Sequence, residues 1–186
     1  MKKEIDQTLT SLKNGNTILY PTDTVWGLGC DATNAKAVSK IYKIKKRIES
    51  KALICLVSSL EMLKTYISDV PKHAVDFLKT TTKPTTIIYE NPRLIAENLI
   101  ASDNTLAIRI VNTGFAHELI KAFNKPIVST SANISGYPTP KSFKEIHPDI
   151  LKQVDYIVNL HNEKIDPQPS TIIKILKDGT IETIRP

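Results

Sequence analysis

The chain has 186 residues, of which 41% are hydrophobic and 24% are charged, and its formal net charge is +6. This length is typical of one domain, and no apolar run approaches the ~20 residues of a membrane-spanning helix. The first six residues contain two lysines and two acids, which is not the pattern of a secretory signal. We therefore expect a single domain over residues 1–186 with no membrane contact.

The cysteine and histidine content argues against two classes of enzyme. Cys30 and Cys55 are too few for a disulfide scaffold and lack metal-site spacing, so reduced thiols in a cytoplasmic protein are expected. The four histidines, at positions 73, 117, 147 and 161, show no HExxH-like spacing. A metal hydrolase or a cysteine nucleophile therefore has little support, and we predict no metal site.

The first half of the chain alternates predicted helices and strands. Ile5, Leu9 and Leu12 follow the helical period and predict a helix over 2–14, which Gly15 ends. A short apolar strand over 17–20 is stopped by Pro21, and 20–33 is interpreted as a loop. There follow a helix over 35–46, an apolar strand over 52–57 of the kind buried on both faces, and helices around 60–67 and 71–78.

The second half is richer in β-branched runs, which predict strands. The final strand follows a hairpin turn at residues 177–180 and so requires at least one antiparallel pair. In chain order we predict strands over 85–89 and 105–111, a helix over 114–123, a strand over 126–129, a loop over 130–141, one or two helical turns to about Gln153, and strands over 155–160, 170–176 and 181–185.

This order predicts an α/β fold: a single domain with a twisted, mixed parallel and antiparallel sheet flanked by helices. No repeat, low-complexity stretch or linker interrupts it. The segments 20–33, 129–141 and 160–170 are then loops at strand ends, where ligands usually bind in such folds.

Positive charge is concentrated in residues 36–51, which carry seven lysines and arginines and only one acid, Glu49. This local charge of +6 equals that of the whole chain, and it indicates an anionic ligand nearby. A solvated helix face explains Lys36, Lys40 and Lys43 better. Lys45 and Arg47 differ because they stand at the predicted end of a helix, where the chain turns into a strand.

Other polar motifs leave two interpretations open. Thr22 and Thr24 lie in a glycine-containing segment and serve either a ligand or a local turn. Arg109 interrupts an apolar strand, so it either faces solvent or reaches an anion. The polar segment 129–136 offers several donors to phosphate or a base, or forms an ordinary turn. Ser170 opens a strand.

Seven of these segments together resemble the YrdC-like family, the threonylcarbamoyl-AMP synthases, in its single-domain form. They occur in one order and span residues 17–186. The matching segments are 21–29 (PTDTVWGLG), 41–47 (IYKIKKR) with Leu53 downstream, 83–86 (KPTT), 107–110 (AIRI), 129–136 (STSANISG), 169–172 (PSTI) and 184–186 (IRP).

The resemblance implies roles for particular residues. Its Lys-x-Arg and Ser-x-Asn pairs correspond to Lys45 with Arg47, expected to be catalytic, and to Ser131 with Asn133. The nucleotide is expected to contact Lys45, Arg47, Ser131, Asn133 and Arg185. L-Threonine is expected to contact Thr22, Arg109 and Ser170. The chain departs from the family pattern at Lys46, Ile48 and Ala52, where glycine and two prolines are common, so loop rigidity differs while both charges remain.

The implied reaction joins L-threonine, bicarbonate or CO2, and ATP into threonylcarbamoyl-AMP, with release of pyrophosphate. Mg²⁺ is expected with ATP. The carbamate of threonine would attack the α-phosphorus, a step that needs positioning and charge neutralisation more than a side-chain nucleophile. The product would supply threonylcarbamoyladenosine in tRNA through downstream transfer proteins.

Two other functions compete with this one. A noncatalytic RNA-binding protein could use the basic segment 36–51 in salt-dependent phosphate contacts. Against it, only 6% of residues are aromatic and no RNP-type motif is visible. A carbamoyl-transfer enzyme of the hydrogenase-maturation type would be expected in a much longer chain.

Overall fold

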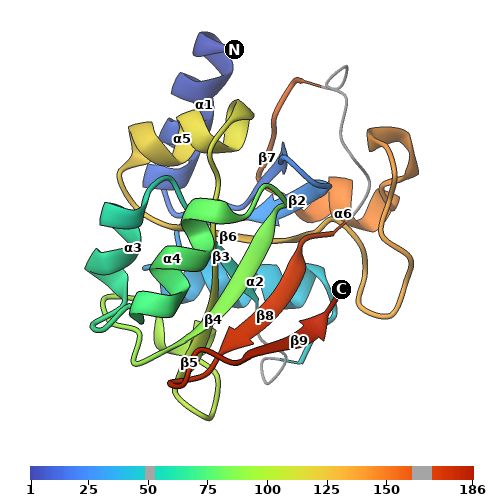
Figure 1. Ribbon diagram of the computed structural model, residues 1–186. Helices are drawn as coiled ribbons and strands as arrows, with labels where there is room; N and C mark the ends of the chain where they lie inside the picture. The colour runs from blue at the N-terminus through green and yellow to red at the C-terminus, as the bar shows by residue number, and fades with distance from the viewer. Residues whose placement is uncertain (49–52, 161–168) are drawn as a thin grey trace.

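A mixed sheet forms the centre of the fold (Figure 1). The structure is a computed structural model that describes residues 1–48, 53–160 and 169–186. The strands of these ranges are β1 Ile18–Pro21, β2 Trp26–Gly29, β3 Ile54–Val57, β4 Thr85–Glu90, β5 Thr105–Ile110, β6 Ile127–Ser131, β7 Tyr156–Ile157, β8 Thr171–Ile175 and β9 Ile181–Arg185. Their order in the sheet is β7-β1-β2-β6-β3-β5-β4-β8-β9.

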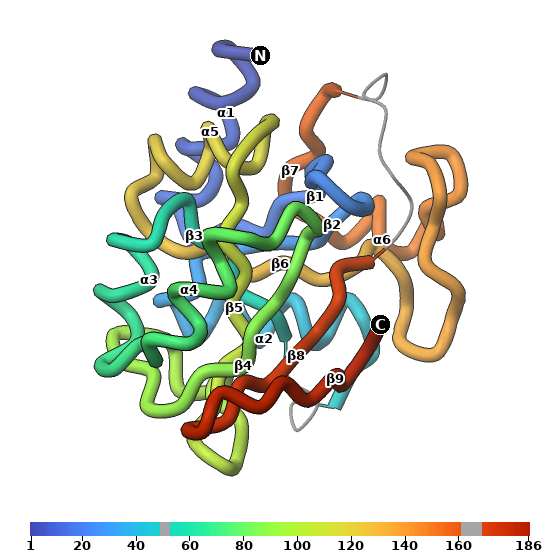
Figure 2. Tube along the Cα trace, viewed as in Figure 1, coloured from blue at the N-terminus to red at the C-terminus, as the bar shows by residue number. Residues whose placement is uncertain are grey.

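Strand directions are mixed along this order. The pairs β1–β7, β3–β5 and β4–β8 are parallel, and the other neighbours are antiparallel. The trace in Figure 2 shows β8 and β9 at the opposite end of the sheet from the N-terminal helix. The predicted α/β fold with a mixed sheet is confirmed.

Helices cover both faces of the sheet. They are α1 Lys2–Lys13, α2 Ala35–Ile44, α3 Leu60–Tyr66, α4 Lys72–Thr80, α5 Gly114–Phe123 and α6 Pro148–Gln153, with short 3-10 turns at Glu97–Leu99 and Phe143–Glu145. Helices α1 and α5 pack together on one face, and α2, α3, α4 and α6 contribute to the core on the other. Among the described residues, none of the helices combines the length and apolar content needed to cross a membrane.

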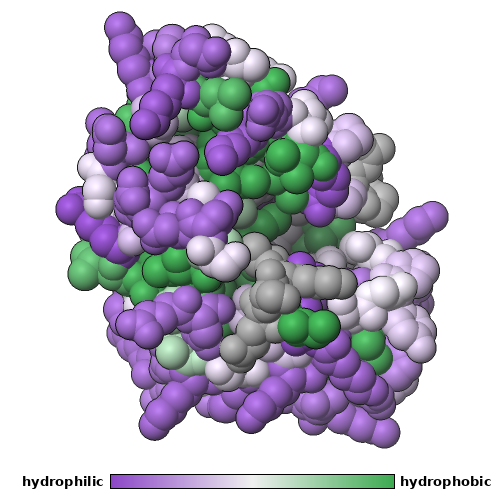
Figure 3. All heavy atoms as spheres, turned by 90° about the horizontal axis from the view of Figure 1, so that it is seen from below, coloured by the Kyte–Doolittle hydropathy of each residue, from purple (hydrophilic) through white to green (hydrophobic). Residues whose placement is uncertain are grey.

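Strand alternation decides which residues face which core, because successive side chains point to opposite faces. On β1, Ile18 and Tyr20 pack towards α1 and α5, whereas Leu19 packs towards α2. On β3, Leu56 lies on the α1–α5 face and Cys55 on the other. Hydrophilic residues cover much of the outer surface in Figure 3, with apolar residues visible in patches between them.

Strand β2 corrects the sequence-based interpretation of 20–33 as a loop. Its sequence is Trp-Gly-Leu-Gly, and the two glycines hide a strand pattern. The structure explains Gly29: a Cβ there would lie 2.6 Å from the Val128 carbonyl oxygen and 2.7 Å from Tyr20 Cε1. The glycine therefore allows β1 and β6 to approach β2 closely.

Other predicted boundaries shift by a few residues. The predicted strand over 155–160 contains only the two residues of β7, and β6 continues to Ser131, inside the predicted loop 130–141. The predicted helix over 35–46 ends at Ile44. Parts of the predicted strand over 52–57 and of the predicted loop 160–170 lie outside the described residues.

We expect Gly29→Ala to lower the free energy of unfolding by about 1–3 kcal/mol or more, since the new methyl group meets a backbone carbonyl. Urea denaturation followed by circular dichroism would measure the loss. Gly27→Ala is the matched control, because its Cβ would meet only side-chain atoms, the nearest at 3.2 Å. Equal stability of the two variants would contradict this account of β2.

Candidate active site

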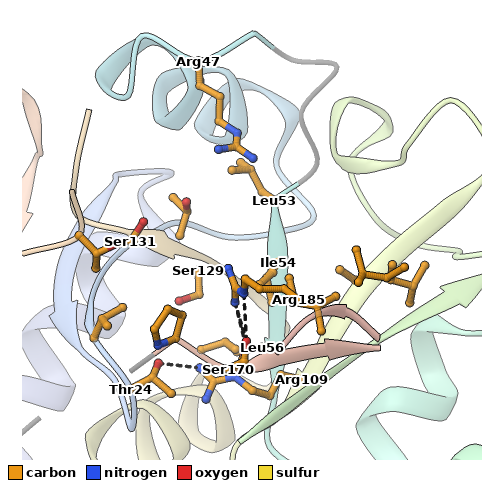
Figure 4. A pocket seen from close by; sticks show the side chains of 18 residues that line it. Thr24, Arg47, Leu53, Ile54, Leu56, Arg109, Ser129, Ser131, Ser170 and Arg185 are labelled. Atoms are coloured by element: carbon orange, nitrogen blue, oxygen red, sulfur yellow. Dashed lines mark hydrogen bonds between the residues drawn. The ribbon is translucent and has the colours of Figure 1, made fainter. Parts of the chain in front are cut away.

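A cavity of about 340 Å³ opens on the α1–α5 face of the sheet, beyond the helices (Figure 4). Alternate residues of β3 and β5 form its floor, including Leu56, Ala107 and Arg109. Three arginines line it, Arg47, Arg109 and Arg185, and no acidic residue is found among the described lining residues. A cavity with this charge suits an anionic ligand.

The end of helix α2 directs Arg47 into this cavity. The Asn34 side chain caps the start of the helix by accepting hydrogen bonds from two backbone N–H groups. At the other end, Lys46 adopts a left-handed conformation with φ of 49°, and the Arg47 N–H donates to the Tyr42 carbonyl oxygen at 2.9 Å. Burial lowers the pKa of Arg47 from its ordinary value, but an arginine keeps its charge.

Lys45 lies behind the cavity, and it is not among the lining residues. Only 1% of the residue is exposed. Its Nζ donates to the Ser131 carbonyl oxygen, to the Asn133 carbonyl oxygen at 2.7 Å and to Asn133 Oδ1 at 3.2 Å. The Ser135 N–H also donates to the Lys45 carbonyl oxygen at 2.8 Å. Lys45 therefore fastens the end of α2 to the segment that follows β6.

Two opposing effects act on the Lys45 ammonium. Burial, with a smaller effect of the charge on Arg47, lowers its pKa to about 7. The three oxygen acceptors match the three donors of an ammonium group, and so they favour the charged form.

The two residues of the predicted Ser131–Asn133 pair lie in different places: one lines the cavity and the other does not. Ser131 lines the cavity and donates through Oγ to Asn133 Oδ1. Asn133 is not a lining residue, and its Nδ2 donates to the Tyr137 carbonyl oxygen at 2.6 Å. Asn133 thus holds the loop in shape, and Ser131 presents a hydroxyl to the cavity.

Arg109 is buried and paired on one side. Its Nη1 contacts both carboxylate oxygens of Asp23 at 2.6 Å. Its Nη2 lies 3.5 Å from Thr24 Oγ1, a contact drawn as a dashed line in Figure 4. The sequence left open whether Arg109 faces solvent or an anion. With only 4% exposure it does not face solvent.

Arg185 and Ser170 meet on the opposite wall. The Arg185 Nη2 donates to the Ser170 carbonyl oxygen at 2.6 Å, and the Ser170 hydroxyl is 2.8 Å from Thr86 Oγ1. Burial, followed by the charge of Arg109, lowers the pKa of Arg185. Strand β9 thereby places Arg185 in the wall of the cavity.

Thr22 does not reach the cavity. Its hydroxyl donates to the Val25 carbonyl oxygen at 2.7 Å and accepts from the N–H groups of Thr24 and Val25, so it closes a local turn. This is one of the two uses that the sequence left open. Thr24 lines the cavity instead.

The structure brings five predicted site residues to one cavity and places three behind or beside it. The lining residues are Arg47, Arg109, Ser131, Ser170 and Arg185; the others are Lys45, Asn133 and Thr22. The sequence left a ligand role open for Thr24 and treated Ser129 only as part of the segment 129–136; both residues line the cavity.

Across residues 1–48, 53–160 and 169–186, the structure has no group of three or more His, Cys, Asp or Glu side chains that could hold a metal ion.

Comparison with known proteins assigns the chain to a family. A family model for Sua5, YciO and YrdC proteins, described as telomere recombination, matches residues 10–186. The chain belongs to the Sua5/YciO/YrdC family. A relative from Methanocaldococcus jannaschii is 37% identical over 186 residues, covering 99% of this chain and 86% of the relative. The threonylcarbamoyl-AMP synthase of Pseudoalteromonas translucida is 35% identical over 170 residues, covering 88% and 89%.

The family is also recognised in solved structures. The crystal structure of P. abyssi Sua5 complexed with L-threonine is 28% identical and superposes with a TM-score of 0.89 over 98% of this chain. The match covers 53% of that chain, so this protein spans about half the length of P. abyssi Sua5. The predicted resemblance is confirmed.

The backbone conformation of Lys46 explains one departure from the Sua5/YciO/YrdC pattern. Lys46 stands where the family pattern often has glycine, and it occupies the left-handed region that glycine enters without a steric cost. The chain keeps the turn that presents Arg47 but forms it with a lysine. Lys46 also pairs with Asp149 at 3.6 Å.

The pKa of Lys45 gives the stability a predictable pH dependence. Its folded value of about 7 lies below the ordinary 10.5, so the folded chain binds fewer protons between these pH values. The cost of burying the charge is fully present below pH 7 and disappears as pH rises towards 10.5, and each pKa unit corresponds to about 1.4 kcal/mol. We expect the free energy of unfolding to rise with pH above 7, and Lys45→Met to flatten that rise.

Urea denaturation at pH 7, 8 and 9 would measure the two slopes. Lys40→Met is the control, because Lys40 is half-exposed and pairs with Asp155 at the surface. Parallel slopes for wild type and Lys45→Met would contradict the lowered pKa of Lys45.

Proposed function

We propose that this protein is an L-threonylcarbamoyladenylate synthase, a nucleotidyltransferase that forms threonylcarbamoyl-AMP and pyrophosphate from L-threonine, bicarbonate or CO2, and ATP. The observation that carries the proposal is the cavity with three arginines and no acidic lining residue among those described. Family membership and the synthase relatives support it. The substrates carry a triphosphate, a carboxylate and a carbamate, so this cavity matches their charge.

In this proposal Arg47, Arg185 and Ser131 bind the phosphates of ATP. The reaction moves negative charge onto the leaving pyrophosphate, and fixed cations in a partly closed site stabilise such charge. Lys45 and Asn133 serve this site by holding the segment that follows Ser131, the last residue of β6, and Lys45 adds positive charge at short range. Lys45 therefore acts mainly through position, whereas Arg47 acts on the ligand.

L-Threonine belongs beside Arg109, with its carboxylate on the guanidinium. Ser170 and Thr24 flank this position. Thr22 contributes through the turn that carries Thr24. The same compound is named in the structure of P. abyssi Sua5, which supports this half of the assignment.

Mg²⁺ enters as the complex with ATP. The lining residues offer arginines and hydroxyl groups rather than carboxylates, so the phosphates would carry the ion, as is usual for nucleotide substrates. We expect the product to pass to separate transfer proteins that modify tRNA, and we expect residues 1–186 to act as one domain in the cytoplasm.

The RNA-binding alternative loses support from the contacts of the basic segment. Lys45 is buried, Lys40 pairs with Asp155, and Lys46 pairs with Asp149. Arg47 points into the cavity. Much of the positive charge in the described part of residues 36–51 is therefore engaged within the protein, although direct contact with tRNA is still compatible with Lys36 and Lys43 at the surface.

Pyrophosphate release by purified protein with Mg²⁺-ATP tests the function. We expect release only when both L-threonine and bicarbonate are present, because the attacking group is the carbamate formed from them. Omission of each in turn is the internal control. Release that is indifferent to L-threonine, or absent from the folded protein, would overturn the proposal.

We expect Arg47→Ala to reduce kcat by about a hundredfold or more with little change in stability, because Arg47 acts on phosphate charge. Arg93→Ala is the matched control: Arg93 bonds the carbonyl oxygens of Lys64 and Thr65 away from the cavity. Steady-state pyrophosphate release and thermal unfolding would separate activity from stability. Wild-type turnover by Arg47→Ala would remove Arg47 from the reaction.

A further inference from the structure

Asp23 brings a carboxylate to the edge of an otherwise cationic site. Both of its carboxylate oxygens lie 2.6 Å from Arg109 Nη1. Its side chain is 22% exposed, whereas that of Arg109 is 4% exposed. Because each carboxylate oxygen has two lone pairs, a contact with one guanidinium nitrogen leaves Asp23 able to accept further hydrogen bonds.

Arg109 also keeps unused donors. Its Nε is buried and has no hydrogen-bond partner among the described residues. Within the described ranges, its Nη2 has only the 3.5 Å contact with Thr24 Oγ1. Nε and Nη2 form one edge of the planar guanidinium, and such an edge binds a carboxylate through two parallel hydrogen bonds. Asp23 therefore engages Nη1 of Arg109, and the Nε–Nη2 edge keeps donor capacity that a second carboxylate could use.

The hollows around this pair allow a ligand to contact both residues. Asp23 lines a second hollow of about 280 Å³, next to the arginine cavity. Thr24 and Pro169 line both spaces, so the two meet at these residues. A small ligand at the junction can therefore contact Arg109 in the first cavity and Asp23 in the second hollow.

An α-amino acid has the complementary charge pattern, because its carboxylate and ammonium are attached to one carbon atom. We propose that Asp23 is a further substrate-binding residue that accepts hydrogen bonds from the α-amino group of L-threonine, whose carboxylate lies on Arg109. This inference rests on the proposed function. A carbamate made from that amine retains one N–H, so the same contact can persist after the carbamate forms.

Asp23 could contact the amine or could serve only to hold Arg109, and the two roles have different consequences for ligand binding. If Asp23 only held Arg109 in place, its loss would weaken every ligand that uses Arg109, with or without an amino group. If it contacts the amine, its loss would weaken only amino-bearing ligands. A ligand that lacks the amine therefore separates the two roles.

The test compares L-threonine with its des-amino analogue, 3-hydroxybutanoate, by isothermal titration calorimetry. We expect wild-type protein to bind L-threonine about 10- to 100-fold more tightly than the analogue, the usual effect of a hydrogen bond between charged groups. We expect Asp23→Asn to lose most of that preference, because it weakens binding of L-threonine much more than binding of the analogue. Asp23→Asn that weakens both ligands equally, or neither, would overturn the proposal.

Asp31→Asn is the matched control, because Asp31 also forms an ion pair, with Lys125 at 2.9 Å, and lines neither hollow. It should keep the wild-type preference. If Asp23→Asn fails to fold by circular dichroism, the wild-type comparison still decides, since equal binding of the two ligands excludes an amine contact. Wild-type protein that binds no L-threonine would contradict the proposed function itself, an outcome distinct from loss of the preference.

Discussion

The buried ammonium group of Lys45 is the interaction on which the geometry of the cavity depends. It joins the end of α2 to the segment after β6 through three oxygen acceptors on two residues. A cation in such a place loses its hydration and is retained only when its donors are matched. Arg47 follows Lys45 at the end of α2, so the contacts of Lys45 fix the position of Arg47 and the shape of the segment after Ser131 together.

The sheet supplies the rest of the site through the alternation of its strands. Leu56 of β3 and Ile127 of β6 belong to the core with α1 and α5, and farther along the same face β3, β5 and β6 line the cavity. Arg109 is buried because it lies beside Leu56 in the sheet and points to the same face. What makes its burial tolerable is Asp23, which arrives from the turn between β1 and β2.

The sequence predicted most of the helices and strands, because their apolar periods are strong. It missed β2, since glycines at two of four positions remove the side chains that carry a strand pattern. Asp23 received no role because a single acid in a presumed loop gives no sign of its partner, 86 positions away.

The sequence by itself determined the α/β class, the family resemblance and the set of charged and hydroxyl residues from which a site for anionic ligands is built. These depend on local periodicity, composition and motif order, which the linear chain contains. Only the tertiary structure decided that Lys45 and Asn133 support the cavity, that Arg47, Arg109 and Arg185 line it, and that Asp23 stands beside Arg109. Those assignments depend on which strands become neighbours in the sheet, and long-range pairing is set by the packing of the whole fold.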